Sequence, residues 1–140
     1  MRAKEYLQQL KKMDIVIQQK IQELSQLKEL GGLKGIDYSQ EKVKNSQANC
    51  ANFESVVIKI IDLENEINNE INKFVDKKHD IINKIQGLEH INYIQILYKR
   101  YVEYKKFEVI SIETNYAYQY IRELHKKGLQ EFERTYKNIH

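Results

Sequence analysis

The sequence predicts an all-α fold, with an N-terminal antiparallel helical hairpin or coiled coil followed by a C-terminal helix-turn-helix. Three observations support this fold class. The 140 residues include no proline and five glycines, so little interrupts a helix. Residues that favour helices, such as Leu, Lys, Glu and Gln, are abundant. Apolar residues also recur at helical spacing over most of the chain.

Composition limits the class of protein further. Charged residues make up 31% of the chain and apolar residues 41%, and no apolar run is long enough to span a bilayer. The N-terminus lacks the apolar core of a secretory signal. Cys50 is the only cysteine, which excludes an internal disulfide and favours a reducing compartment. We therefore expect a cytoplasmic protein that has no membrane partner.

Residues 2–30 are predicted to form one amphipathic helix. The apolar residues of its buried face recur every seven residues and at positions between, and they are Leu10, Met13, Ile17, Ile21, Leu24 and Leu27. Gly31, Gly32 and Gly35 then break the pattern. We expect a long loop over residues 31–52, with at most a short helical turn.

A second, longer helix is predicted over residues 53–86. A heptad of apolar residues runs along it: Phe53, Ile60, Ile67, Phe74, Ile81 and Leu88. A second set completes the seam with a small register drift: Val56, Leu63, Ile71 and Ile85. The simplest packing sets this helix antiparallel to residues 2–30. Because two helices bury little surface, the seam also favours a homodimer.

Gly87 ends the second helix, so we expect residues 1–88 to form an oligomerisation or partner-binding domain. Residues 89–140 then form the C-terminal domain. Its first helix is predicted over residues 91–104, with an apolar face made of Ile94, Leu97, Tyr98 and Tyr101. Lys105 and Lys106 form a short link to the helix-turn-helix.

The helix-turn-helix is predicted over residues 107–126. Phe107 and Ile110, one helical turn apart, face the core, as do Tyr116, Ile121 and Leu124. Ser111 has the small side chain that a close helix crossing needs. Asn115 tolerates a left-handed backbone, so it can turn the chain sharply.

The outer face of the second helix carries side chains that suit DNA bases. Gln119 can pair with adenine, Arg122 with guanine, and Glu123 can accept from the cytosine amino group. Tyr118 is placed to touch a base or a sugar. Lysines around the unit can reach phosphates: Lys105, Lys106, Lys126 and Lys127, with Lys99 and Arg100 beside them. An ordinary helical pair shows the same apolar spacing, but the polar outer face favours double-stranded DNA as partner.

Residues 93–132 resemble a known family. The phrases LYKRYV at 97–102 and LHKKGL at 124–129, with Phe107 and Asn115-Tyr116 between them, carry the resemblance. They are similar to the promoter-binding region 4 of bacterial sigma-70 factors. They are most similar to small phage-encoded sigma-like proteins of Gram-positive bacteria. KVKNS and VIKIIDLENEINNEINKFVDKK in the N-terminal half resemble the coiled-coil part of those proteins.

The resemblance implies a DNA-binding transcription regulator of phage or prophage origin. Three positions depart from the pattern. Gly128 and Ser111 stand where the family has alanine, and Ala117 stands where a serine would cap the recognition helix, a loss of about 1 kcal/mol. Residues 1–88 also lack the tryptophan and most of the aromatic residues that a promoter-melting domain needs. We therefore expect a dimer on DNA or an accessory factor of RNA polymerase, and not a complete sigma factor.

Two other functions stay open. A phage DNA-packaging protein of the small terminase type also joins a helix-turn-helix to oligomerisation helices, usually in the reverse order. A protein-binding anti-sigma or polymerase-binding factor would present the same outer face to protein. We expect no enzyme activity, because no nucleophile is paired with a base. We expect no cofactor and no metal site, because the histidines and Cys50 lack ligand spacing.

Overall fold

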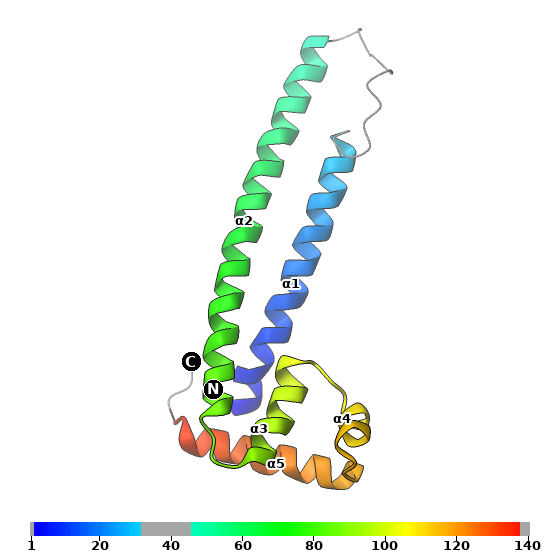
Figure 1. Ribbon diagram of the computed structural model, residues 1–140. Coiled ribbons are helices and arrows are strands. Elements are labelled where there is room, and N and C mark those ends of the chain that lie inside the picture. Colours follow the sequence, from blue (N-terminus) through cyan, green and yellow to red (C-terminus); the bar gives the residue numbers. More distant parts are fainter. Residues whose placement is uncertain (1, 32–45, 138–140) are drawn as a thin grey trace. The chain divides into compact units, whose positions relative to one another are not determined.

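The protein is all-helical in the computed structural model (Figure 1), which confirms that the fold is all-α. The structure describes residues 2–31 and 46–137, and for 46–52 it gives the backbone alone. The helices are α1 (Ala3–Leu30), α2 (Ser46–Gln86), α3 (Ile91–Leu97), the π-helix η1 (Tyr98–Val102), α4 (Phe107–Thr114) and α5 (Tyr118–Thr135). The described residues form no β-strand.

Helix α2 begins seven residues earlier than predicted. We expected a loop over residues 31–52, but the chain is helical from Ser46. The early start has a local reason, because the segment from Ser46 to Asn52 has no proline or glycine to break a helix. The rest of the expected loop, including Gly32 and Gly35, lies outside the described residues.

The chain folds into two compact units, each built from more than one segment. Unit 1 comprises Met1–Asp14 and Lys73–His140, and unit 2 comprises Ile15–Asn72. Helices α1 and α2 therefore each contribute one end to each unit. The expected domain boundary near residue 88 concerns which parts fold independently, and it stays a prediction.

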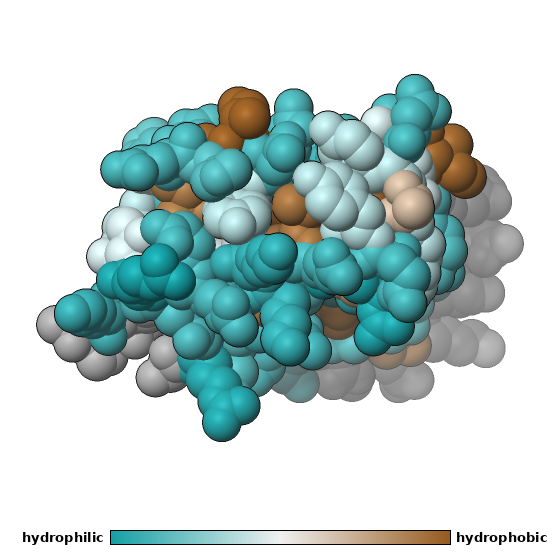
Figure 2. All heavy atoms as spheres, turned by 90° about the horizontal axis from the view of Figure 1, so that it is seen from below, coloured by the Kyte–Doolittle hydropathy of each residue, from teal (hydrophilic) through white to brown (hydrophobic). Residues whose placement is uncertain are grey.

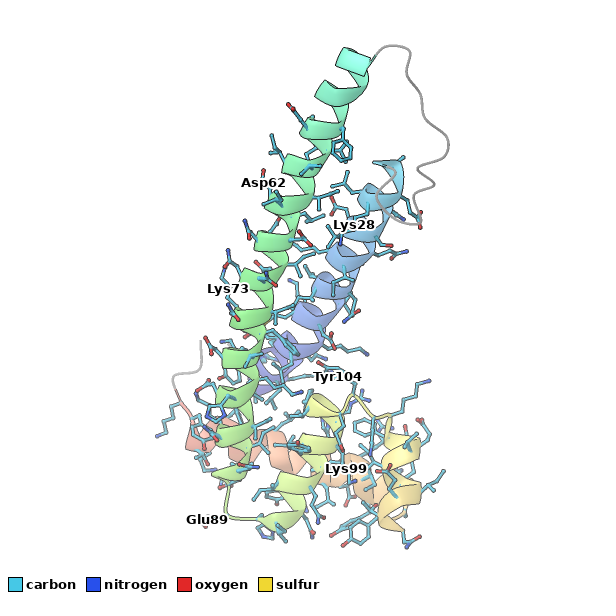
Figure 3. All side chains as sticks on the ribbon, turned by 45° about the horizontal axis from the view of Figure 1, so that its top comes forward. Lys28, Asp62, Lys73, Glu89, Lys99 and Tyr104 are labelled. Atoms are coloured by element: carbon cyan, nitrogen blue, oxygen red, sulfur yellow. The ribbon has the colours of Figure 1, made fainter. Side chains whose placement is uncertain are left out.

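Unit 2 is a pair of antiparallel helical segments. Lys20 forms an ion pair with Glu66, and Lys28 lies 3.6 Å from Glu64. Figure 3 labels Lys28 on α1. The seam between the segments buries residues of the expected heptads: Ile17, Ile60, Leu63 and Ile67.

Two expected members of that seam lie outside it. Ile21 is 40% exposed and Phe53 is 47% exposed. The physical reason is that one partner helix covers only a narrow stripe of the other, so residues at the edge of the stripe stay in contact with water.

Unit 1 holds a continuous core. Four residues from the first turns of α1 are buried in it, namely Ala3, Tyr6, Leu7 and Leu10. Helix α5 packs against them through Phe132, whose ring centroid lies 6.0 Å from that of Tyr6. The other buried residues come from the end of α2 and from the later helices, and they include Ile81, Ile85, Leu88, Ile96, Leu97, Ile110 and Ile121.

The predicted helix over residues 91–104 changes form partway. It is an α-helix to Leu97 and a π-helix from Tyr98 to Val102. Tyr104 then takes a left-handed backbone with φ of 60°, which costs an L residue roughly 1–2 kcal/mol. Burial of its ring against the core of unit 1 offsets this strain. Figure 3 labels Tyr104 at the end of η1.

Gly128 lies in the interior of α5 and faces α3. A Cβ built on it would lie 3.5 Å from Leu97 Cγ and 3.6 Å from Tyr93 Cβ, which are ordinary packing distances. The replacement Gly128→Ala should therefore raise the free energy of unfolding by about 1 kcal/mol, because alanine favours a helix over glycine. Urea denaturation measures this change. The control Gln130→Ala, at an exposed position of α5, should change it by a few tenths of a kcal/mol. A loss of stability in Gly128→Ala would contradict the packing described here.

Candidate nucleic-acid interface

Helices α4 and α5 meet at a sharp turn. Asn115 ends α4 in the left-handed conformation, with φ of 61° and ψ of 23°, as its residue type predicted. Ser111 has a role beyond its small size, because its hydroxyl donates a hydrogen bond to the backbone carbonyl of Tyr116. This bond holds the far side of the turn to α4.

The contact between α4 and α5 is apolar. Ile110 is fully buried, and Ile121 and Leu124 are buried opposite it, as expected. Tyr116 was expected in this core, but it is 37% exposed, and its ring meets Tyr120 edge-on at 5.0 Å. The turn directs Tyr116 outward because the space beneath it is already filled by the aliphatic side chains.

The start of α5 has no side-chain cap, as expected. Ala117 is the N-cap residue, in an extended conformation, and it makes no side-chain hydrogen bond to the helix. Its carbonyl accepts the first helical bond, from the backbone nitrogen of Ile121 at 3.0 Å.

The residues that the sequence analysis predicted to contact bases lie exposed on α5. Gln119, Arg122, Glu123 and Lys126 are all exposed, and Tyr118 is exposed beside them. The Arg122 guanidinium lies 5.9 Å from the centre of the Tyr118 ring. Figure 2 shows the molecule from below the view of Figure 1, and hydrophilic side chains cover most of the surface seen there.

An open hollow of about 510 Å³ lies on this face. Four of the predicted residues line it, namely Gln119, Arg122, Glu123 and Lys126. Phe107 and His125 form part of its wall, and Lys4 from the first turn of α1 completes it. The structure thus brings together residues from the consecutive helices α4 and α5 and one residue from α1, which is remote from them in sequence.

The cations predicted to reach phosphates divide into two groups. Lys105 and Lys99 both form ion pairs with Glu113, at 2.8 and 2.9 Å, and Figure 3 shows Lys99 between η1 and α4. These two lysines hold the pKa of the Glu113 carboxyl below its usual value. Lys106 and Lys127 are exposed.

By contrast, Lys4, Arg122 and Lys126 form no ion pair with any residue that the structure describes. Their charges therefore remain available to an outside anion, whereas those of Lys99 and Lys105 are already paired.

An aromatic cluster adjoins the hollow through Phe107 and His125. Phe107 lies between the Arg100 guanidinium, 4.3 Å from its ring centre, and the His125 ring at 4.9 Å. The guanidinium also donates to the carbonyl of Lys105 at 3.1 Å, so Arg100 serves the fold and is not a free phosphate contact. His125 in turn lies 2.6 Å from the Tyr101 hydroxyl.

Burial governs the titration of this cluster. Burial raises the pKa of Tyr101 to about 12. Burial, together with the charges of Arg100 and Lys4, lowers the pKa of His125 to about 4. His125 is therefore a neutral, packed side chain at neutral pH.

Lys4 is the residue of this site that the sequence analysis missed. Its signal was present, because Ala3, Tyr6, Leu7 and Leu10 have the spacing of a buried helix stripe, which leaves Lys4 on the surface. Nothing in the local pattern, however, indicates that this stripe packs against α5.

Comparison of the chain with protein-family models, with curated proteins and with solved structures finds no match. Across the described residues, no helix combines the length and the apolar character needed to cross a membrane. Those residues also contain no group of three or more His, Cys, Asp or Glu side chains arranged to hold a metal ion. The Cys50 side chain lies outside this search.

The left-handed turn gives a test of the unit. Asn115→Ala should lower the free energy of unfolding by roughly 1 kcal/mol, because a Cβ without a compensating polar group is disfavoured in this conformation. Asn115→Gly should leave stability nearly unchanged, because glycine adopts positive φ freely. Thermal unfolding followed by circular dichroism compares the variants. Equal losses in both would contradict the left-handed turn.

The lowered pKa of the half-buried His125 can be tested by varying the pH. The pKa of His125 is about 4 in the folded protein against 6.5 for a free histidine, so the unfolded chain binds a proton more readily between these values. This group's contribution to stability is therefore complete above pH 6.5 and is lost as the pH falls towards about 4. NMR titration of the His125 ring should give a midpoint near 4. A midpoint near 6.5 would show that the ring is solvated.

The control is a pair of variants measured by urea denaturation at pH 7 and pH 5. His125→Gln should reduce the difference in stability between the two pH values. His90→Gln, a matched change at an exposed histidine, should preserve that difference.

Proposed function

We propose that the protein is a DNA-binding transcription regulator that recognises promoter DNA through α4, the turn at Asn115 and α5. One observation carries the proposal. The outer face of α5 presents Gln119, Arg122 and Lys126, side chains that read bases and phosphates, and its two cations have no ion-pair partner among the described residues. The resemblance to sigma region 4 supports the same function and a phage or prophage origin.

The packing of the two helices fits this role. A recognition helix must present its polar face while the opposite face is held rigidly, and α5 buries Ile121, Leu124 and Phe132 on the side away from that face. Its first turn is fixed by the turn at Asn115 and by the hydrogen bond from Ser111. The side chains that approach the major groove therefore project from a fixed backbone.

A homodimer through the coiled coil is part of the proposal. Unit 2 leaves large aliphatic side chains in contact with water, among them Leu30 at 84%, Ile58 at 59% and Ile61 at 50% exposure. A second copy that covered them would stabilise a pair of helices that buries little by itself. A symmetric dimer should prefer two half-sites separated by whole turns of DNA.

A protein-binding role is the second candidate, and one observation favours it. Beside the outer face of α5, four exposed apolar and aromatic residues come from α4, the turn and the first turn of α5, namely Val109, Ile112, Tyr116 and Tyr120, with Ile112 exposed to 76%. Tyrosine and aliphatic side chains of this kind are typical of protein contacts. An anti-sigma or polymerase-binding factor would use these residues, and RNA polymerase is then the expected partner.

The test is a gel-shift titration on DNA upstream of the protein's own gene, with and without competitor, at two salt concentrations. We expect binding that resists competitor. Arg122→Ala should cost about 1–3 kcal/mol and relax the preference at one base pair, because a bidentate contact is lost. Lys126→Ala should weaken binding to all DNA sequences alike and should reduce the slope of log K against log salt by about 1. Lys59→Ala, an exposed lysine of unit 2, is the control and should change neither.

Two results would count against the regulator. DNA binding that is lost with competitor or with salt would favour a DNA-packaging protein of the small terminase type. A ring of many subunits in solution would support the same alternative. No salt-dependent DNA binding at all would favour the protein-binding candidate.

A further inference from the structure

The first turn of α1 is fixed beside α5 within unit 1. The backbone nitrogen of Ala3 donates a hydrogen bond to Glu133 Oε1 at 3.0 Å. Ala3 is fully buried, and Tyr6, one turn later, is 1% exposed with its ring against Phe132. A surface residue on this turn therefore has a defined position relative to the outer face of α5.

Lys4 is that surface residue. It is exposed, it follows Ala3 directly, and it lines the same hollow as Arg122 and Lys126. Its charge is close enough to the half-buried His125 to help lower the pKa of that ring. Three positive side chains therefore face one carboxylate, Glu123, around one opening.

The charge of this hollow selects an anion. None of its three cations forms an ion pair with a described residue, and the single carboxylate of Glu123 offsets only part of their charge, so the hollow is positively charged. The adjoining face of α5 carries the side chains proposed to read bases, and the anion next to a base in the groove is a phosphodiester of the DNA backbone. A lysine on a flexible stem suits such a phosphate as a point charge.

We propose that Lys4 contacts a backbone phosphate of the bound DNA, so that the first turn of α1 belongs to the DNA interface. This inference rests on the proposed function. It adds a contact that lies more than 110 residues away in sequence from the recognition helix. The contact gives affinity and fixes the orientation of α5 on the duplex, and it does not read the sequence.

The experiment compares Lys4→Gln with Lys12→Gln, a matched change at another exposed lysine of α1. Fluorescence anisotropy measures Kd on labelled duplex DNA at four salt concentrations for the full chain and both variants. Lys4→Gln should weaken binding several-fold on every duplex. Loss of one phosphate contact should also lower the slope of log K against log salt by about 0.9. Lys12→Gln should leave both quantities unchanged.

The outcomes separate this inference from the proposed function. Lys126→Gln is measured in parallel as a contact on α5 itself. If Lys126→Gln lowers the slope but Lys4→Gln binds like the unmodified protein, the role of Lys4 is overturned while the function stands. If the unmodified protein shows no salt-dependent binding to DNA, both are overturned. Circular dichroism of each variant checks that helix content is preserved, because Lys4 adjoins the buried Ala3.

Discussion

The burial of Phe132 of α5 against Tyr6 of α1 is the contact on which unit 1 depends. Both side chains are excluded from water, and their rings lie 6.0 Å apart. The Tyr6 hydroxyl then donates to Asp80 of α2, and Lys84 pairs with the same carboxylate at 2.8 Å. Tyr136 closes the set by donating to the carbonyl of Lys84 at 2.7 Å. Three segments remote in sequence are thus joined at one aromatic centre, and the direction in which α5 presents its outer face follows from it.

The helices were predictable because helical periodicity is a local property. The heptads that run through Leu10 and Ile17, and through Ile60 and Ile67, placed α1 and most of α2 correctly. The start of α2 was harder to predict, because the helix begins at Ser46, before the first residue of the apolar heptad pattern. The π-helix at η1 and the left-handed Tyr104 were not predictable, since neither conformation is the local preference of the residues that adopt it.

The candidate site shows the same division. The prediction of a sharp turn at Asn115 was correct because asparagine itself tolerates the left-handed backbone that the turn requires. Glu113 pairs with Lys99 and Lys105, which lie 14 and 8 residues away in sequence. The sequence analysis therefore predicted that both lysines could reach phosphates, although the fold pairs them with a carboxylate. Lys4 was missed for the opposite reason, since only the tertiary packing of α1 brings it to the hollow. Charge is therefore the quantity that the sequence predicts least well here, because it depends on neighbours that the fold supplies.

The hydrogen bond between Ala3 and Glu133 joins residues separated by 130 positions, and this distance bears on how the protein is made. A contact between residues so far apart in sequence forms slowly, and it cannot form before both residues have been synthesised. At roughly 5–20 residues per second, a ribosome needs on the order of 10 s between Leu10 and Phe132. During that interval, Tyr6, Leu7 and Leu10 have no cover from α5. The nascent chain thus carries an uncovered apolar stripe at these three residues, and unit 1 can close only after Phe132 has been synthesised.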